Sequence, residues 1–423
     1  MTPPPPPQPV ATTLPPQPVA TPPPPQPVAS APPSPATPSA PARANAGQAR
    51  RPSLPRVTEL LLSAFAGHRG TAFRLGDLTL LAGPSGTGKT TALRAYEALA
   101  RLGGGAELGE VFPDPSACVP ERARPDAQRR RGFRIGCTAD GPEGQVRLEV
   151  AVQAEPELRI VGERLSADGL VLLETALRDP SRRTVQAAWH TAGATAVTRA
   201  PLPDDRLGTA LLPLRVAGTT EGQLRVLAAA EQMLVALRSV FPCDPRPERM
   251  RDPVPAGSGR LLPGCENLAD VLGRTRSECT RRHALLVDAV RVGCAGPVAD
   301  LLAEPCAGGR LVRAVLDRGN GARTALRRLG DGELRYTALA LVLLTGPGVL
   351  EADVAGEVPA ALQCLTVLAD GLDRAQDPAQ RAALLALAAR MCERGHIRLV
   401  GAVSDATWAA GVPGATVVHL RRD

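Results

Sequence analysis

The stretch LTLLAGPSGTGKT, residues 78–90, decides the fold of this chain. The apolar run 78–82 predicts a buried strand, and the helix-forming stretch 91–102 follows the glycines and ends at three further glycines. Strand, glycine-rich loop and helix in this order are the context that a phosphate-binding loop requires. We therefore expect this segment to bind a nucleoside triphosphate, ATP.

Each residue type in the loop has a physical task. Gly83, Gly86 and Gly88 let the backbone curl so that successive amides face an anion, and the helix that follows adds its positive end. Lys89 is expected to neutralise the β and γ phosphates, and the Thr90 hydroxyl to be a ligand of Mg²⁺. The expected binding residues are Gly83, Pro84, Ser85, Gly86, Thr87, Gly88, Lys89, Thr90 and Thr91.

Amino-acid usage singles out the same lysine. Of the 49 basic residues, 48 are arginine, so Lys89 is the one lysine of the chain. A compact ammonium and a planar guanidinium are not interchangeable. The chemistry at position 89 is therefore expected to need the ammonium.

The first 55 residues form a segment of their own. Residues 1–42 carry no charged side chain, and 19 of the 44 prolines lie within the first 50 positions. Such a composition favours polyproline II and prevents a packed core, which predicts a disordered leader. A docking ligand for a proline-reading domain remains the alternative, although no specific motif supports it. The body, residues 56–423, is long enough for one large or two medium domains.

The composition argues against membrane, secreted, disulfide-rich and zinc-binding proteins. The longest apolar runs, 60–64 and 338–344, are too short to cross a bilayer, and the amino terminus lacks the pattern of a signal peptide. Nine cysteines without any C-x-x-C argue against a disulfide framework and a zinc site. We expect a cytoplasmic protein that does not enter membranes.

A second motif lies about 240 residues after the loop. Leu329-Gly330-Asp331-Gly332-Glu333 precedes a helical run at 334–344, and the apolar strand 365–369 ends in Asp370. A helix at 378–394 and strands at 397–403 and 415–420 then predict a βαβ unit, hence a parallel sheet. The fold class is therefore expected to be α/β, with helices on both faces of the sheet.

These blocks together resemble the RecF/OLD/SMC branch of the ABC-type and AAA-type P-loop ATPases. The opening L-x-L-x-x-F at 60–65 and weaker segments at 159–165, 250–251 and 264–268 resemble the same branch. The resemblance implies that Asp370 holds Mg²⁺ as the Walker B aspartate. Residues 329–333 resemble the signature motif of ABC-type ATPases, which opens a helix. The resemblance implies that Gly330, Asp331, Gly332 and Glu333 of this motif contact ATP bound to a partner subunit, so that two copies form a homodimer. No nuclease-type carboxylate block follows residue 410, where OLD proteins carry their toprim domain, so we expect any nuclease to be a partner protein.

Three positions depart from that family. Gly330 replaces the signature serine, Gly371 replaces the catalytic glutamate after Asp370, and 401–405 lack the switch histidine. The catalytic set is therefore expected to be Lys89, Asp370 and Asp373, the next carboxylate. A carboxylate that positions the attacking water raises the rate of hydrolysis by about 10²–10⁴-fold. We therefore expect slow ATP hydrolysis unless Asp373 or Asp405 takes the place of the missing glutamate.

Residues 103–320 are expected to form an α+β insertion between the two halves of the nucleotide site. Hairpins are predicted around 145–152 and helices at 222–240 and 267–292, with Asn267 as a helix cap. An arginine cluster comprises Arg122, Arg124, Arg129, Arg130, Arg131 and Arg134. It is either a patch for the phosphates of duplex DNA or a solvated loop.

Two functions of different classes follow from the sequence. One is an ATP-driven dimer switch that clamps DNA in repair or defence. The other is a nucleotide-sensing regulator that binds a protein partner and hardly hydrolyses ATP. A small-molecule kinase is a distant third, because the signature motif has no place in it.

Overall fold

The computed structural model describes residues 54–191, 197–257, 259–353, 356, 358–359 and 362–421. The chain divides into two compact units, residues 1–50 and 51–423, and every described residue belongs to the second. The expected proline-rich leader lies outside the described residues except for 54 and 55. Within the described part, no helix combines the length and the apolar character needed to cross a membrane.

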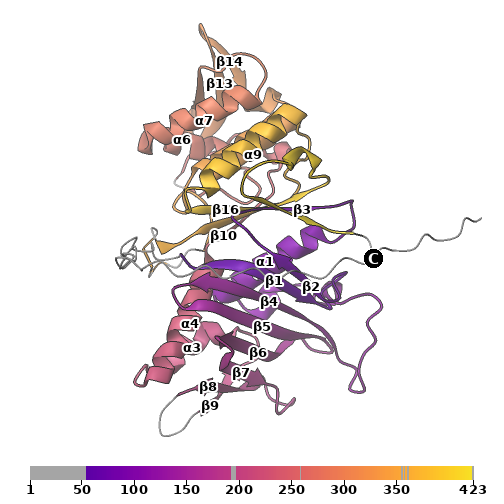
Figure 1. Cartoon of the computed structure of the whole chain (residues 1–423). Helices are drawn as coiled ribbons and strands as arrows, with labels where there is room; N and C mark the ends of the chain where they lie inside the picture. The colour runs from indigo at the N-terminus through magenta and orange to yellow at the C-terminus, as the bar shows by residue number, and fades with distance from the viewer. Residues whose placement is uncertain are drawn as a thin grey trace, which may run out of the picture. The chain divides into compact units, whose positions relative to one another are not determined.

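A five-stranded parallel sheet carries the phosphate-loop strand near its edge (Figure 1). Its order is β10 (Val240–Cys243), β15 (Leu365–Ala369), β16 (Ile397–Val403), β3 (Leu78–Ala82) and β17 (Ala415–His419). Strands 78–82, 365–369 and 397–403 have the bounds that the sequence predicts, since fully buried strands read as continuous apolar runs. Strand β10 lies within the range expected to be inserted, yet it forms one edge of this sheet.

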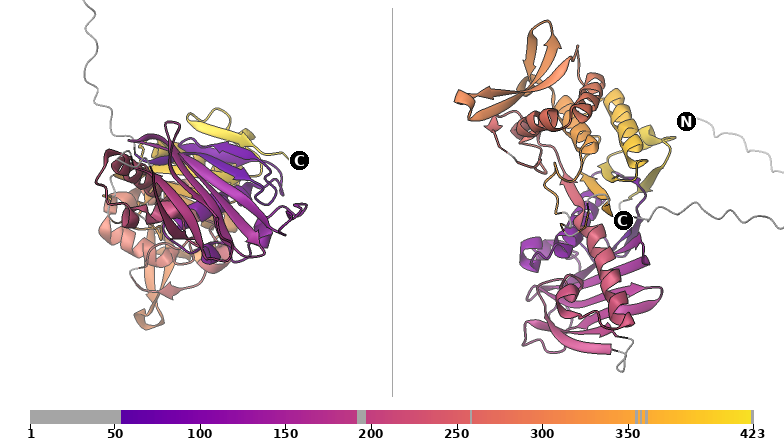
Figure 2. Two further views of the ribbon diagram at one scale, coloured as in Figure 1. Left: turned by 90° about the horizontal axis from the view of Figure 1, so that it is seen from below. Right: turned by 90° about the vertical axis from the view of Figure 1, so that its left-hand side faces the viewer.

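An eight-stranded antiparallel sheet contains both the first strands of the body and most of the middle of the chain. Its order is β2 (Thr71–Arg74), β1 (Arg56–Ser63), β4 (Arg131–Gly141), β5 (Gly144–Glu155), β6 (Arg159–Ala167), β7 (Leu170–Ala176), β8 (Thr184–His190) and β9 (Val197–Pro203). Both views of Figure 2 show these indigo and magenta strands as one layer. A smaller sheet comprises β11 (Val254–Pro255), β12 (Asp300–Cys306), β13 (Leu311–Gly319) and β14 (Ala322–Ala325).

The longer helices are α1 (Lys89–Gly103), α3 (Gly208–Arg215), α4 (Glu221–Arg238), α6 (Leu268–Glu278), α7 (Thr280–Gly293), α8 (Asp331–Leu344) and α9 (Pro378–Cys392). Two short helices are α2 (Leu108–Val111) and α5 (Pro247–Met250). Alternate side chains of β3 join different cores, because successive residues of a strand point to opposite faces. Leu81 packs with α1, α4 and the antiparallel sheet, whereas Leu78 and Leu80 pack with α8 and α9.

Arg398 joins the two large sheets. It lies on β16, is 1% exposed, and its guanidinium donates to the carbonyl oxygens of Val57, Leu75 and Gly76 at 2.6, 2.9 and 2.8 Å. These acceptors lie on β1 and in the connection from β2 to β3. A single side chain thus ties the parallel sheet to the first hairpin of the antiparallel one.

The helical stretch expected over 267–292 is confirmed, but it is divided into two helices. The chain forms α6 and α7, separated at Cys279, whose backbone is extended (φ −150, ψ 87). The two helices pack on different partners, α6 on β12 and β13 and α7 on α8 and α9, so the chain must change direction. Asn267 precedes α6, but its side chain accepts from the Leu262 amide and donates to the Arg260 carbonyl instead of capping the helix.

Candidate functional site

The glycine-rich loop connects the end of β3 to the start of α1. Gly86 and Gly88 have φ of 84 and 88, the left-handed region that glycine adopts without strain. A side chain on Gly83 would lie 2.4 Å from the Leu420 carbonyl oxygen, so the chain end that follows β17 packs directly on the loop. The Thr87 hydroxyl donates to the Pro84 carbonyl at 2.9 Å and closes the turn.

Lys89 lies across this loop. Its ammonium donates to the carbonyl oxygens of Gly83 at 2.6 Å and Pro84 at 2.9 Å. Both acceptors belong to the loop itself, so the charge is held over the curl in which the amides gather. Phosphate oxygens entering the loop are stronger partners for an ammonium than neutral carbonyls.

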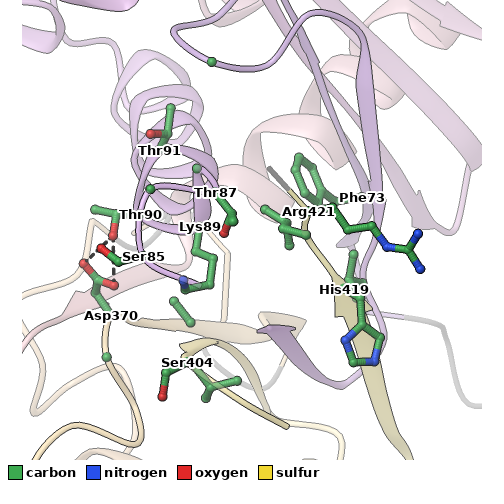
Figure 3. Close-up of a pocket in the computed structure, with 18 of the residues that line it drawn as sticks. Phe73, Ser85, Thr87, Lys89, Thr90, Thr91, Asp370, Ser404, His419 and Arg421 are labelled. Carbon is green, nitrogen blue, oxygen red and sulfur yellow. Dashed lines mark hydrogen bonds between the residues drawn. The ribbon is translucent and has the colours of Figure 1, made fainter. Parts of the chain in front are cut away.

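Thr90 and Asp370 meet although 280 residues separate them. The Thr90 hydroxyl lies 3.2 and 3.0 Å from the two carboxylate oxygens of Asp370 (Figure 3). The parallel arrangement explains the meeting, because β3 and β15 both flank β16 and end at the same edge. Mg²⁺ prefers oxygen ligands and uses one or two side chains with phosphates and water, so this pair fits a magnesium ion.

A cavity of about 1310 Å³ opens around these groups. Its lining includes the loop from Ser85 to Thr91, Asp370 and the segment after it, and the ends of β16 and β17. In Figure 3, Asp370 lies on one side of Lys89, and Phe73, His419 and Arg421 lie on the other. The volume and the charged groups are sufficient for a nucleoside triphosphate.

The replacement after Asp370 has a backbone explanation. Gly371 has φ of 60, a conformation that other residues adopt only with strain, so glycine suits this position, which lines the cavity directly after Asp370. Asp373 does line the cavity, but one of its oxygens accepts from both the amide (2.8 Å) and the hydroxyl of Ser404. Ser404 directly follows β16, within the segment 401–405 that lacks a histidine.

Asp405 is not brought into the cavity. Its oxygens accept from the side chain and the amide of Thr407, and these hydrogen bonds hold the pKa of Asp405 below its usual value. Of the two carboxylates considered as substitutes for the missing glutamate, only Asp373 is therefore placed near the loop.

The signature segment lies outside the cavity of its own chain. It forms the start of α8, where the Glu333 carboxylate accepts from the amides of Gly330 (2.9 Å) and Ala295 (2.8 Å), and Asp331 pairs with Arg251 at 2.6 Å. Packing explains why position 332 is glycine, since a side chain there would lie 2.2 Å from the Ala375 carbonyl oxygen.

Arg335, which sequence reasoning missed, links this helix to the loop that follows β15. It is 2% exposed, and its guanidinium donates to the carbonyls of Asp370 and Gly371, both at 3.0 Å, and pairs with Asp244 at 3.2 Å. The available signal was one charged residue inside the apolar stretch of α8. Such a residue is rarely buried unless it is paired.

The arginine cluster is partly neutralised by its neighbours. Arg130 pairs with Asp126 at 2.8 Å, and Arg131 forms a two-nitrogen contact with Glu155. The other four arginines of the cluster are exposed, namely Arg122, Arg124, Arg129 and Arg134. Fewer charges are thus available to phosphates than the sequence suggests.

Comparison with protein-family models found no match, and comparison with curated proteins found none. Among solved structures, the chain is similar to an SMC head bound to the C-terminal winged-helix domain of ScpA, with TM-score 0.44 and 11% identity over 82% of this chain and 90% of that one. An SMC head with an extended coiled coil, bound to a ScpA domain from Pyrococcus furiosus, has TM-score 0.42 and 12% identity over 87% and 94%. The SMC head of Thermotoga maritima has TM-score 0.38 and 12% identity over 83% and 89%.

Proposed function

We propose that residues 56–423 form an ATP-binding, ABC-type P-loop ATPase of the RecF/OLD/SMC-like branch, with residues 103–320 between the two halves of its site. The observation that carries the proposal is the contact of the Thr90 hydroxyl with both oxygens of Asp370, beside Lys89. A chance glycine loop would not place a magnesium-type oxygen pair at its helix start.

The residues divide the work by charge. The loop amides and the Lys89 ammonium bind the phosphates, while Thr90 and Asp370 hold Mg²⁺, which screens phosphate charge when it is bound. Asp373 is the carboxylate available to orient an attacking water. The Ser404 contact, which occupies one of its oxygens, fixes that carboxylate at the cavity wall.

The signature segment supports a homodimer. Gly330 to Glu333 start a helix, which is an anion-binding element, yet they lie outside the cavity of their own chain. Their proposed ligand is ATP held by a second copy. Dimer closure with ATP and opening without it would then be the switch.

Two features favour the regulator as the second candidate. Gly371 removes the usual catalytic carboxylate, and Asp373 is already engaged by Ser404. Slow turnover with tight binding suits a nucleotide sensor that captures a protein partner. The DNA clamp instead depends on the exposed arginines of the cluster, which would make binding to duplex DNA salt-dependent.

The deciding experiment measures ATP binding and steady-state ATP turnover of the full chain, with and without duplex DNA. We expect Lys89→Ala to abolish ATP binding, because no other lysine can supply the ammonium. Arg94→Ala, an exposed cation on the same helix α1, is the matched control and should bind ATP like the wild type.

The outcomes separate the candidates. Turnover that rises with duplex DNA and falls after joint substitution of Arg122, Arg124, Arg129 and Arg134 by alanine favours the clamp. ATP binding without measurable turnover, unchanged by DNA, favours the regulator. Absence of ATP binding by the wild-type chain would refute the proposed function.

A further inference from the structure

His68 belongs to no motif, yet it lies against the phosphate loop. It follows β1 in a tight turn, lines the same cavity as Lys89, and is 6% exposed. Its Nε2 lies 3.1 Å from the Gly88 carbonyl oxygen. The ring also packs edge-on against Phe73, with 5.4 Å between ring centres.

The surroundings of the ring fix its tautomer. A carbonyl oxygen can only accept, so Nε2 must carry a hydrogen and donate it to Gly88. Nδ1 lies 3.4 Å from the Thr71 hydroxyl, which can donate to it. A ring with a hydrogen on Nε2 therefore satisfies both contacts at once.

The Gly88 carbonyl controls the next amide. It accepts from His68 and also from the Ala92 amide at 2.9 Å, the first hydrogen bond of α1. The Gly88 carbonyl and the Lys89 N–H share one planar trans peptide and point in opposite directions. Two donors on the carbonyl thus hold the Lys89 N–H toward the open side of the helix start, where a phosphate would lie.

The contact is tight and anchored on both sides. A side chain on Gly88 would lie 2.5 Å from His68 Nε2, so the loop and the ring are in van der Waals contact. The amide of Phe65 donates to the His68 carbonyl at 3.0 Å, and the His68 amide donates to the Phe65 carbonyl at 2.8 Å. The turn that carries the ring is therefore closed by two backbone bonds.

We propose that His68 is a positioning residue of the phosphate loop, whose Nε2–H holds the Gly88 peptide so that the Lys89 amide faces the phosphates. The inference rests on the proposed nucleotide binding at this loop. His68 acts on the phosphate end of the ligand. Its removal should therefore weaken every ligand that carries a polyphosphate, whatever its base.

The test compares His68→Phe, which keeps a ring against Phe73 but loses the donor, with His68→Gln, which keeps an N–H of similar reach. His190→Phe is the control, because His190 lies on β8 and does not line the cavity. Calorimetry on the full chain measures the Kd of ATP, ADP and inorganic tripolyphosphate, each with Mg²⁺, and thermal unfolding gives Tm.

We expect His68→Phe to weaken all three ligands about tenfold, the loss of one net hydrogen bond, with Tm close to wild type. His68→Gln should recover most of the affinity. Unchanged affinity in His68→Phe, or a loss confined to ATP and ADP, would overturn the inference while leaving the proposed function intact. Failure of the wild-type chain to bind any of the three ligands would instead overturn the proposed function.

Discussion

Gly371 is the residue at which the proposed ATPase departs most from an efficient catalyst. Gly371 directly follows Asp370 and has φ of 60. A side chain on Gly371 would lie 2.9 Å from the Arg374 guanidinium. A non-glycine residue pays about 1–2 kcal/mol of strain in this conformation. A glutamate at this position would nevertheless place a carboxylate beside Arg374 and the cavity.

We predict that Gly371→Glu raises ATP turnover, by up to about 10²-fold, while lowering the free energy of unfolding by about 1–2 kcal/mol. Steady-state turnover and urea unfolding measure the two effects. Gly371→Gln is the matched control, because it carries the same backbone strain without a carboxylate. Equal turnover in the two variants would contradict the proposed reason for slow hydrolysis.

The role of Asp373, the carboxylate already present in the cavity, can be tested in the same assay. Asp373→Asn should lower turnover at least tenfold and leave ATP affinity near wild type, because Asp373 lies in the cavity but not in the loop. Asp405→Asn, whose position is outside the cavity, should leave turnover unchanged. Turnover that survives Asp373→Asn would remove Asp373 from the catalytic set.

At the scale of elements, the first amides of helix α3 donate to a carboxylate that belongs to another element. Glu163 of β6 is 3% exposed and accepts from the Gly208 amide at 2.6 Å, the Thr209 amide at 2.7 Å and the Thr209 hydroxyl. It thus satisfies the free amides at the start of α3. Burial raises the pKa of Glu163 above its usual value, although the hydrogen bonds from Thr209 and Gly208 oppose this rise.

The raised pKa makes a stability prediction whose sign is fixed. A group with a higher pKa in the folded state contributes stability that is fully present below its unfolded pKa and is lost as pH rises through the folded one. Relative to Glu163→Gln, the wild type should therefore lose free energy of unfolding as pH rises from 4 upward. Urea midpoints of both proteins across pH 4–8 test this, and a constant difference between them would contradict it.

The sequence predicts elements and motif residues better than the contacts between elements. Strand β15 follows from an apolar run, and the importance of Thr90 follows from a loop that needs specific residue types, whereas the choice of Asp370 as its partner rests on the family resemblance. Arg335, Ser404 and His68 escape such reasoning, because their roles depend on neighbours that are remote in sequence. Asn267 shows the same limit, since its partners lie in the preceding loop and not in the helix it precedes.

At the scale of the whole unit, Arg398 holds two sheets together. We predict that Arg398→Met lowers the free energy of unfolding by about 3 kcal/mol or more, because the buried carbonyl oxygens of Val57 and Leu75 lose this donor and the Gly76 oxygen is left with the 3.4 Å contact of the Thr79 hydroxyl. Urea unfolding measures the change. Arg394→Met, at an exposed position just before β16, is the control and should shift stability little. Similar losses in both variants would refute the role given to Arg398.

Strand β3 pairs only with strands from the end of the chain, residue 78 with 399 on one side and with 415 on the other. On the ribosome, every strand of the antiparallel sheet through β9 is therefore made while the phosphate loop still lacks both flanking strands. The proposed nucleotide pocket is therefore complete only after β16 and β17 have been translated, and a product that ends before β16 would carry the intact glycine loop without the strands that hold it.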